Sequence, residues 1–194
     1  RDSMPAIGLA AYVIRQRFGD EAPIASFAAD HAITHPQVLL DCVERALEVA
    51  QKGYVVTIGL KPLTPSTAYG YIAPGETFEK ESVEKGSIVR SFVEKPDEET
   101  ATRYCEQGYL WNAGMFIMTA GTLARALRRF HPDMDTHLSA IGNQWGSDSF
   151  AKTLSDEWPA LTKIAIDHAI AEPLALEGGV AVVPATDMGW TDVG

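Results

Sequence analysis

The sequence predicts an α/β fold, and three neighbouring segments carry that prediction. Residues 23–29, PIASFAA, form a short apolar run that ends at Asp30, as expected of a strand buried on both faces. Residues 36–52 repeat apolar positions at helical spacing, and residues 54–60, YVVTIGL, form the next strand. Strand, helix and strand within about thirty residues make the crossover unit of an α/β sheet, for which we expect a right-handed connection.

The remaining elements follow from their own start and stop signals. Ser3 is expected to cap a first helix that stops at Gly19, and Asp97 to begin a short helix that Gly108 closes. A Pro-rich excursion separates two of the strands. That excursion covers residues 61–72, further strands are expected over 87–94, 109–118 and 180–184, and further helices from 119 to about 154.

Composition and charge exclude several classes of protein. The chain has 194 residues, 46% apolar and 22% charged, which is typical of one globular domain. Its net charge of -10 excludes a sequence-wide basic surface for nucleic acid. Cys42 and Cys105 form no Cys-x-x-Cys pair, so we expect neither a disulfide framework nor a cysteine metal site. The absence of a membrane-length apolar run and of a signal peptide predicts a cytoplasmic protein without a membrane partner.

Two candidate sites follow expected strands. Asp30, with His31 after it, ends the first apolar run, where a carboxylate suits Mg²⁺ or merely caps the next turn. Glu94 and Lys95 end another strand. Glu94 could accept hydrogen bonds from sugar hydroxyls and Lys95 could bind a phosphate, or the two form a surface ion pair.

Three further segments carry polar groups in telling places. Asn112 interrupts an apolar strand, and Gly114 allows close approach of a ligand or backbone; a bulge with a satisfied amide is the alternative. Asp192 could share the cation of Asp30, since distance along the chain is no obstacle in a sheet. Asp167 could bind a ligand hydroxyl or cap a helix. The sequence contains neither Gly-x-Gly-x-x-Gly nor a Walker loop, so these residues identify no nucleotide site.

Together these segments resemble the bacterial mannose-1-phosphate guanylyltransferases, a family also called GDP-mannose pyrophosphorylases. The resemblance covers essentially all 194 residues, with the blocks in the same order. FVEKP and WNAGMF are shared widely among sugar-nucleotide pyrophosphorylases, whereas two blocks point to the mannose branch. Those two are TIGLKPLTPSTAYGYI and IAIDHAIAE, and the other matching blocks are RDSMPAIGLAA, AADHAI and GWTDVG.

The resemblance implies a Rossmann-like α/β/α sandwich of the nucleotide-diphosphosugar transferase type, with a mostly parallel mixed sheet. It implies one nucleotidyltransferase domain over residues 1–194 that lacks its N-terminal part, because the family's glycine-rich nucleotide loop precedes the position matching Arg1. The implied reaction joins GTP and mannose 1-phosphate to give GDP-mannose and pyrophosphate. A homo-oligomer is compatible with the sequence.

The resemblance also implies roles for individual residues. Asp30 and Asp192 would hold Mg²⁺, and Lys95 would contact the sugar phosphate. The mannose would be lined by Glu94, Asn112, Gly114 and Asp167, with Gly70 and Tyr71 as its lid-side wall. Two departures are Ala68 and His168, where the family commonly has glycine and tyrosine. The competing hypotheses are another sugar-1-phosphate nucleotidyltransferase and a non-catalytic sugar-phosphate-binding module.

Overall fold

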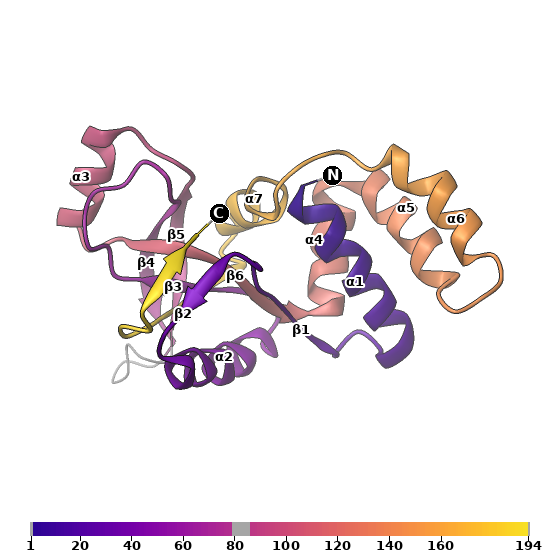
Figure 1. The fold of residues 1–194 in the computed structure, drawn as a ribbon, viewed down its shortest axis with the longest axis horizontal. Coiled ribbons are helices and arrows are strands. Elements are labelled where there is room, and N and C mark those ends of the chain that lie inside the picture. The colour runs from indigo at the N-terminus through magenta and orange to yellow at the C-terminus, as the bar shows by residue number, and fades with distance from the viewer. Residues whose placement is uncertain (1, 79–85, 194) are drawn as a thin grey trace. The chain divides into compact units, whose positions relative to one another are not determined.

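The computed structural model describes residues 2–78 and 86–193 (Figure 1). Its helices and strands in chain order are α1 (Ser3–Phe18), β1 (Pro23–Ser26), β2 (His31–Ile33), α2 (Pro36–Ala50), β3 (Val55–Leu60), β4 (Tyr71–Thr77), β5 (Ser87–Val93), α3 (Glu98–Glu106), β6 (Leu110–Thr119), α4 (Ala120–Phe130), α5 (Pro132–Asn143), α6 (Phe150–Glu157), η2 (Trp158–Ala160), η3 (Asp167–Ala171), α7 (Glu172–Ala175), β7 (Val180–Pro184) and β8 (Trp190–Asp192). The α/β fold class is confirmed. The chain divides into two compact units, residues 1–24 with 119–173 and residues 25–118 with 174–194.

The first unit is helical, and α1 packs against α4 and α5. Its contacts are close because Gly8 of α1 has no side chain: a Cβ there would come within 2.6 Å of Leu138 of α5. The N-cap of α1 is Asp2, whose side chain accepts a hydrogen bond from the Ser3 backbone, so the prediction of Ser3 as the cap is wrong by one residue. The Ser3 hydroxyl instead accepts a hydrogen bond from the backbone N–H of Ile166 at 3.0 Å.

The second unit is built on a mixed six-stranded sheet in the order β1-β6-β3-β7-β5-β4. The pair β3–β7 is parallel, whereas β3–β6, β4–β5, β4–β6 and β5–β7 are antiparallel. The prediction of a mostly parallel sheet is therefore wrong. Hydrophobic runs such as β3 and β7 signal burial on both faces, and an antiparallel strand covered on both faces gives the same signal.

The predicted crossover unit also differs, since β6 lies between β1 and β3 in the sheet. The strand expected over residues 23–29 is only four residues long, and its burial alternates, with Ile24 its one buried residue. The helix at 36–50 and the fully buried strand at 55–60 form as predicted. One face of the sheet packs against α2 through Cys42, Ala46, Val49, Val56, Ile58 and Met115, all 3% exposed or less.

Three of the strands were not predicted from the sequence. Strand β4 contains Pro74, which breaks the register with β5, and proline in a run argues against a strand. Strands β2 and β8 have three residues each and pair with each other in a separate antiparallel sheet, visible as adjacent arrows in Figure 1. These two strands are too short to show a period, yet they position the candidate site.

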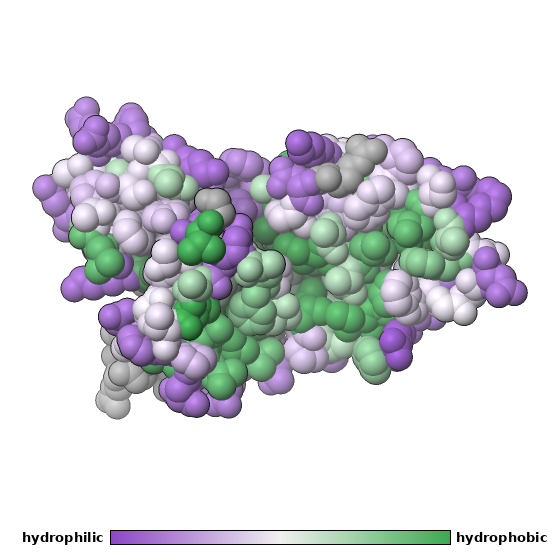
Figure 2. Space-filling view, in the orientation of Figure 1, coloured by the Kyte–Doolittle hydropathy of each residue, from purple (hydrophilic) through white to green (hydrophobic). Residues whose placement is uncertain are grey.

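Helix α3 begins where predicted, at the N-cap Asp97. Its first turn carries Glu98 and Glu99, whose charges interact favourably with the helix dipole, and Figure 2 shows hydrophilic side chains over this helix. Among residues 2–78 and 86–193, none of the helices is both long and apolar enough to cross a membrane.

Candidate functional site

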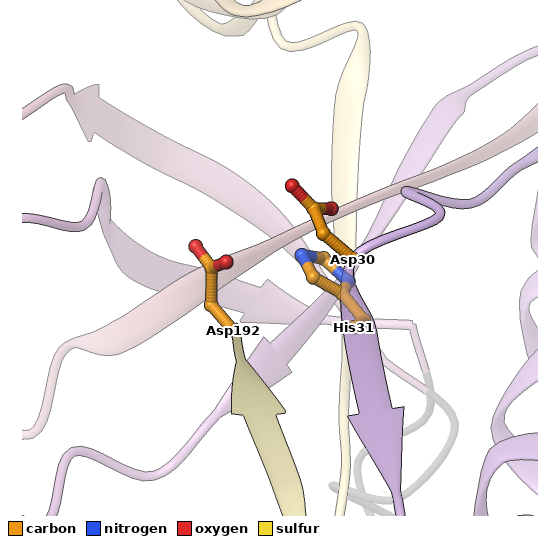
Figure 3. A group of neighbouring side chains, drawn as sticks. All are labelled: Asp30, His31 and Asp192. Carbon is orange, nitrogen blue, oxygen red and sulfur yellow. The ribbon is translucent and has the colours of Figure 1, made fainter. Parts of the chain in front are cut away.

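The β2–β8 pair brings two aspartates from opposite ends of the chain together. His31 lies directly opposite Asp192 in the antiparallel register, and the Val193 N–H donates to the Asp30 carbonyl at 2.9 Å. Asp30, His31 and Asp192 each offer one ligand atom, and these atoms lie within 4.8 Å of one another (Figure 3). The two aspartates are therefore close enough to share a cation. The sequence had predicted neither β2 nor β8, the strands that bring them together.

The two carboxylates of this donor set are ligands of the kind that Mg²⁺ takes. Two carboxylates that converge repel each other unless a cation lies between them, and both aspartates are exposed, so their remaining ligands can be water or phosphate oxygens. Mg²⁺ typically takes one or two carboxylates together with substrate phosphates. Asp30 and Asp192 supply that number.

Glu94 and Lys95 follow β5 with an unusual backbone. Lys95 has φ +47°, in the left-handed region that disfavours residues other than glycine, and such backbone strain concentrates at functional sites. Its Nζ lies 3.7 Å from the Glu94 Oε1. The Glu94 side chain is 18% exposed and that of Lys95 is 64% exposed, so the ammonium group stays accessible while the carboxylate is half-buried. Lys95 can therefore form the ion pair with Glu94 and still bind a phosphate.

Gly70 lies where the half-buried Glu94 carboxylate meets Asn112. A Cβ at position 70 would run into the Glu94 Oε2 and come 3.4 Å from the Asn112 Cβ. The Asn112 backbone N–H donates to the Gly70 carbonyl at 2.8 Å. Three predicted sugar ligands from three different segments therefore share one location.

Asn112 and Gly114 belong to a bulge in β6. The pairing with β3 passes from Thr57 opposite Phe116 to Gly59 opposite Asn112, so β6 holds two extra residues there, and Gly114 has φ +66°. The Asn112 Oδ1 accepts from the Thr57 hydroxyl at 2.7 Å and from the Gly114 N–H at 3.2 Å. With its oxygen so used, the Asn112 carboxamide would meet a sugar hydroxyl through its Nδ2 donor group.

The bulge also connects this location to the aspartates. A Cβ on Gly114 would lie at ordinary van der Waals distance, 3.8 Å, from the His31 Cε1, so the bulge faces the imidazole. Gly70, Glu94, Asn112 and Gly114 are therefore neighbours within the second unit, and the face of Gly114 that a Cβ would occupy is turned toward His31.

Tyr71 is placed differently from its neighbour Gly70. Its side chain is fully buried, its ring lies against Tyr104, and its hydroxyl accepts a hydrogen bond from the Ser66 N–H at 2.9 Å. Tyr71 thus supports the 61–70 loop from the core, and its backbone is the part that can line a site. Asp167 belongs to the first unit, where it is the first residue of the π-helix η3, an element frequent at functional sites.

Sequence reasoning missed the aromatic residues around the aspartates. Trp190 contacts both His31 and Tyr69 with ring centroids 5.2 Å apart, and Tyr69 contacts Trp111 at 4.9 Å. Lys61, Trp111 and Trp190 line a cavity of about 400 Å³. Only their places in the sequence could have indicated these aromatic residues, because Trp190 lies two residues before Asp192 and Trp111 lies directly before Asn112.

The pKa of Asp97, two residues after Lys95, is shifted downward. Thr100 donates hydrogen bonds to the Asp97 carboxylate, including one from its backbone N–H at 2.8 Å, and these favour the charged form. The capped helix therefore fixes the chain directly after Lys95.

Comparison with known families decides the class of protein. The whole chain, residues 1–194, matches the nucleotidyl transferase family. This chain belongs to the nucleotidyl transferase family. The site described above therefore lies in a member of this family, and the resemblance to mannose-1-phosphate guanylyltransferases is confirmed by matches over the whole of this chain to proteins of that name.

Two curated relatives illustrate the similarity in sequence. This nucleotidyl transferase is 34% identical over 197 residues to a mannose-1-phosphate guanylyltransferase of Sinorhizobium fredii (strain NBRC 101917 / NGR234), covering all of this chain and 37% of the relative. It is 36% identical over 197 residues to mannose-1-phosphate guanylyltransferase ManC of Salmonella typhimurium, covering all of this chain and 40% of that relative. The chain thus spans about two fifths of the length of these relatives.

The similarity extends to three dimensions. A crystal structure described as mannose-1-phosphate geranyltransferase from Thermus thermophilus superimposes with a TM-score of 0.82 at 30% identity, covering all of this chain and 52% of that one. The α/β fold with its mixed sheet is therefore shared.

Proposed function

We propose that this nucleotidyl transferase transfers the guanylyl group of GTP to α-D-mannose 1-phosphate, giving GDP-mannose and pyrophosphate. The observation that carries the proposal is the convergence of Asp30 and Asp192 beside His31, with their donor atoms within 4.8 Å. A dication is needed wherever triphosphate and sugar phosphate oxygens must approach each other. The relatives named mannose-1-phosphate guanylyltransferase support the choice of guanine and mannose.

In this reaction a phosphate oxygen of mannose 1-phosphate attacks the α-phosphorus of GTP. The new P–O bond forms as the bond from the α-phosphorus to the bridging β-phosphate oxygen breaks, and pyrophosphate leaves with that electron pair. Mg²⁺, held by Asp30 and Asp192, would supply charge neutralisation at the phosphate oxygens.

The residues near the strand ends would orient the sugar phosphate. The exposed Lys95 ammonium would bind its phosphate, and the left-handed backbone at that residue fixes where the side chain starts. Glu94 would accept hydrogen bonds from mannose hydroxyls, and Asn112 would donate to one. Gly70 leaves the space that brings Glu94 close to Asn112. Positioning of this kind supplies much of the rate enhancement in phosphoryl and nucleotidyl transfer.

A substrate panel tests the proposal. The full-length purified protein with Mg²⁺ is incubated with each of GTP, ATP, CTP and UTP against mannose 1-phosphate, glucose 1-phosphate and N-acetylglucosamine 1-phosphate, and sugar nucleotides are identified by mass spectrometry. GTP with mannose 1-phosphate should give the highest kcat/KM. A preference for another pair would establish a different sugar-1-phosphate nucleotidyltransferase. Tight mannose 1-phosphate binding without any product would establish a binding module.

A further inference from the structure

The cation site contains a nitrogen donor that the two aspartates do not need. In the antiparallel β2–β8 pair, His31 is directly opposite Asp192, and directly opposed residues place their side chains on the same face. Figure 3 shows the His31 ring beside the carboxylates of Asp30 and Asp192. The sheet register, and not a chance side-chain rotation, therefore places the imidazole in the donor set.

Packing holds the His31 ring in this position. Trp190 meets it edge-on, with ring centroids 5.2 Å apart and an interplanar angle of 76°. Within residues 2–78 and 86–193, the His31 Nδ1 is buried and has no hydrogen-bond partner. No hydrogen bond therefore engages this nitrogen among the described residues, so its lone pair is a donor that a cation can use.

We infer that His31 is a third ligand of the proposed cation and that the site consequently prefers Mn²⁺ or Co²⁺ to Mg²⁺. The inference rests on the proposed function for the existence of the cation. Donors bound at about 2.1 Å lie at most about 4.2 Å apart, so small rotations of the two exposed aspartates bring all three onto one ion.

The ligand chemistry sets the direction of the preference. Mg²⁺ favours oxygen donors in octahedral geometry and gives up its waters reluctantly, whereas imidazole nitrogen suits first-row transition metals. A set of two carboxylate oxygens and one imidazole nitrogen therefore binds Mn²⁺ more tightly than Mg²⁺, and it binds Co²⁺ more tightly still.

The variant His31→Asn separates the two kinds of ligand, because it replaces a nitrogen donor with an amide oxygen. Calorimetry on the purified protein should show the Mn²⁺ dissociation constant rising by at least about tenfold, a loss that even outer partners of a metal-bound histidine produce. The Mg²⁺ dissociation constant should change by less than about threefold. Retained Mg²⁺ binding also shows that the variant is folded.

The control is His35→Asn. His35 is nearby in the chain, but its Nδ1 lies 3.2 Å from the Asp187 carbonyl, and it is not part of the donor cluster. This variant should bind Mn²⁺ like the wild type. Asp30→Asn should weaken binding of both cations.

Pulsed electron paramagnetic resonance of bound Mn²⁺ gives a readout independent of activity. The wild type and His35→Asn should show coupling to a ¹⁴N nucleus, and His31→Asn should lose it. The inference is overturned if the wild type shows no nitrogen coupling, or if His31→Asn retains both the coupling and the Mn²⁺ affinity.

These results are distinguishable from those on the proposed function. Nitrogen coupling without any sugar nucleotide product would uphold the histidine ligand and refute the guanylyltransferase proposal. Formation of GDP-mannose without nitrogen coupling would do the reverse.

Discussion

Lys95 combines an exposed ammonium group with a left-handed backbone at the end of β5. We expect Lys95→Ala to raise the KM for mannose 1-phosphate by roughly 10- to 100-fold, because a charged hydrogen bond contributes about 1.5 to 3 kcal/mol. Lys52→Ala is the control: that ammonium lies over the Phe78 ring, 5.6 Å from its centroid. Steady-state kinetics of the two variants measure the effect, and equal KM values would remove Lys95 from the site.

Gly70 makes a second prediction at the same scale. Its backbone is not left-handed, so Gly70→Ala adds only a methyl group, which meets the Glu94 carboxylate. Displacing that carboxylate should lower kcat/KM by roughly tenfold to a hundredfold, with little loss of stability. Gly53→Ala should behave oppositely, because Gly53 has φ +95° and open space around it. It should lower the unfolding temperature and leave kcat/KM unchanged; a kinetic effect of equal size in both variants would contradict the assignment.

Individual residues show how much of the candidate site could be predicted from the sequence. The positions of Asp30, Glu94, Lys95 and Asn112 after or within strands predicted polar groups at a sheet edge. The sequence could not predict that the side chain of Tyr71 turns into the core while Gly70 faces Glu94, because a one-residue shift in a strand exchanges its faces. The sequence names His31 beside Asp30 but gives it no ligand role, because only the β2–β8 register brings it to Asp192.

The Tyr71 hydroxyl of β4 binds the 61–70 loop through the Ser66 N–H. Tyr71→Phe removes the acceptor of the Ser66 N–H, so we expect the free energy of unfolding to fall by about 1 kcal/mol. Amide hydrogen exchange at Ser66 should become faster. Tyr109→Phe is the control, since the Tyr109 ring stacks on Tyr104 at 4.3 Å outside this loop. Unchanged exchange at Ser66 in Tyr71→Phe would show that other contacts hold the loop.

Helix α3 supplies a pH-dependent test. Hydrogen bonds from Thr100 lower the pKa of Asp97 in the folded state, so its contribution to stability is present above the unfolded pKa near 4 and is lost as the pH falls through the lower folded pKa. Asp97→Ala should therefore lower the unfolding temperature at pH 7, and the difference from the wild type should shrink toward pH 2. A difference that stays constant over this range would show that the charge of the cap contributes nothing.

At the scale of elements, the hydrophobic pattern predicted which helices and strands form better than it predicted how the strands are arranged in the sheet. Segments with a clear start signal or continuous burial, such as α2, β3 and α3, form close to their predicted bounds. Strand direction was wrong, because buried parallel and antiparallel strands are equally apolar. The sequence predicted the β6 bulge only as one of two alternatives at Asn112. The two extra residues can be recognised only from the pairing of β6 with β3.

At the scale of the whole molecule, the second unit contains the aspartates, the histidine, Glu94, Lys95 and the β6 bulge. A net charge of -10 makes the chain repel phosphates in general, so the local cation and Lys95 have to reverse the field at one place. The central claim is therefore that Asp30 and Asp192 hold the dication on which nucleotidyl transfer depends.

Phosphorus NMR tests that claim most directly. The full-length purified protein is incubated with GTP, mannose 1-phosphate and Mg²⁺, and the wild type is compared with Asp30→Asn and Asp192→Asn. We predict that the wild type forms a sugar nucleotide diphosphate and pyrophosphate in equal amounts, that a chelator stops the reaction, and that each variant is at least about a hundredfold slower, as expected when transition-state charge loses its counterion. Wild-type rates in both variants, or release of inorganic phosphate in place of pyrophosphate, would contradict the claim.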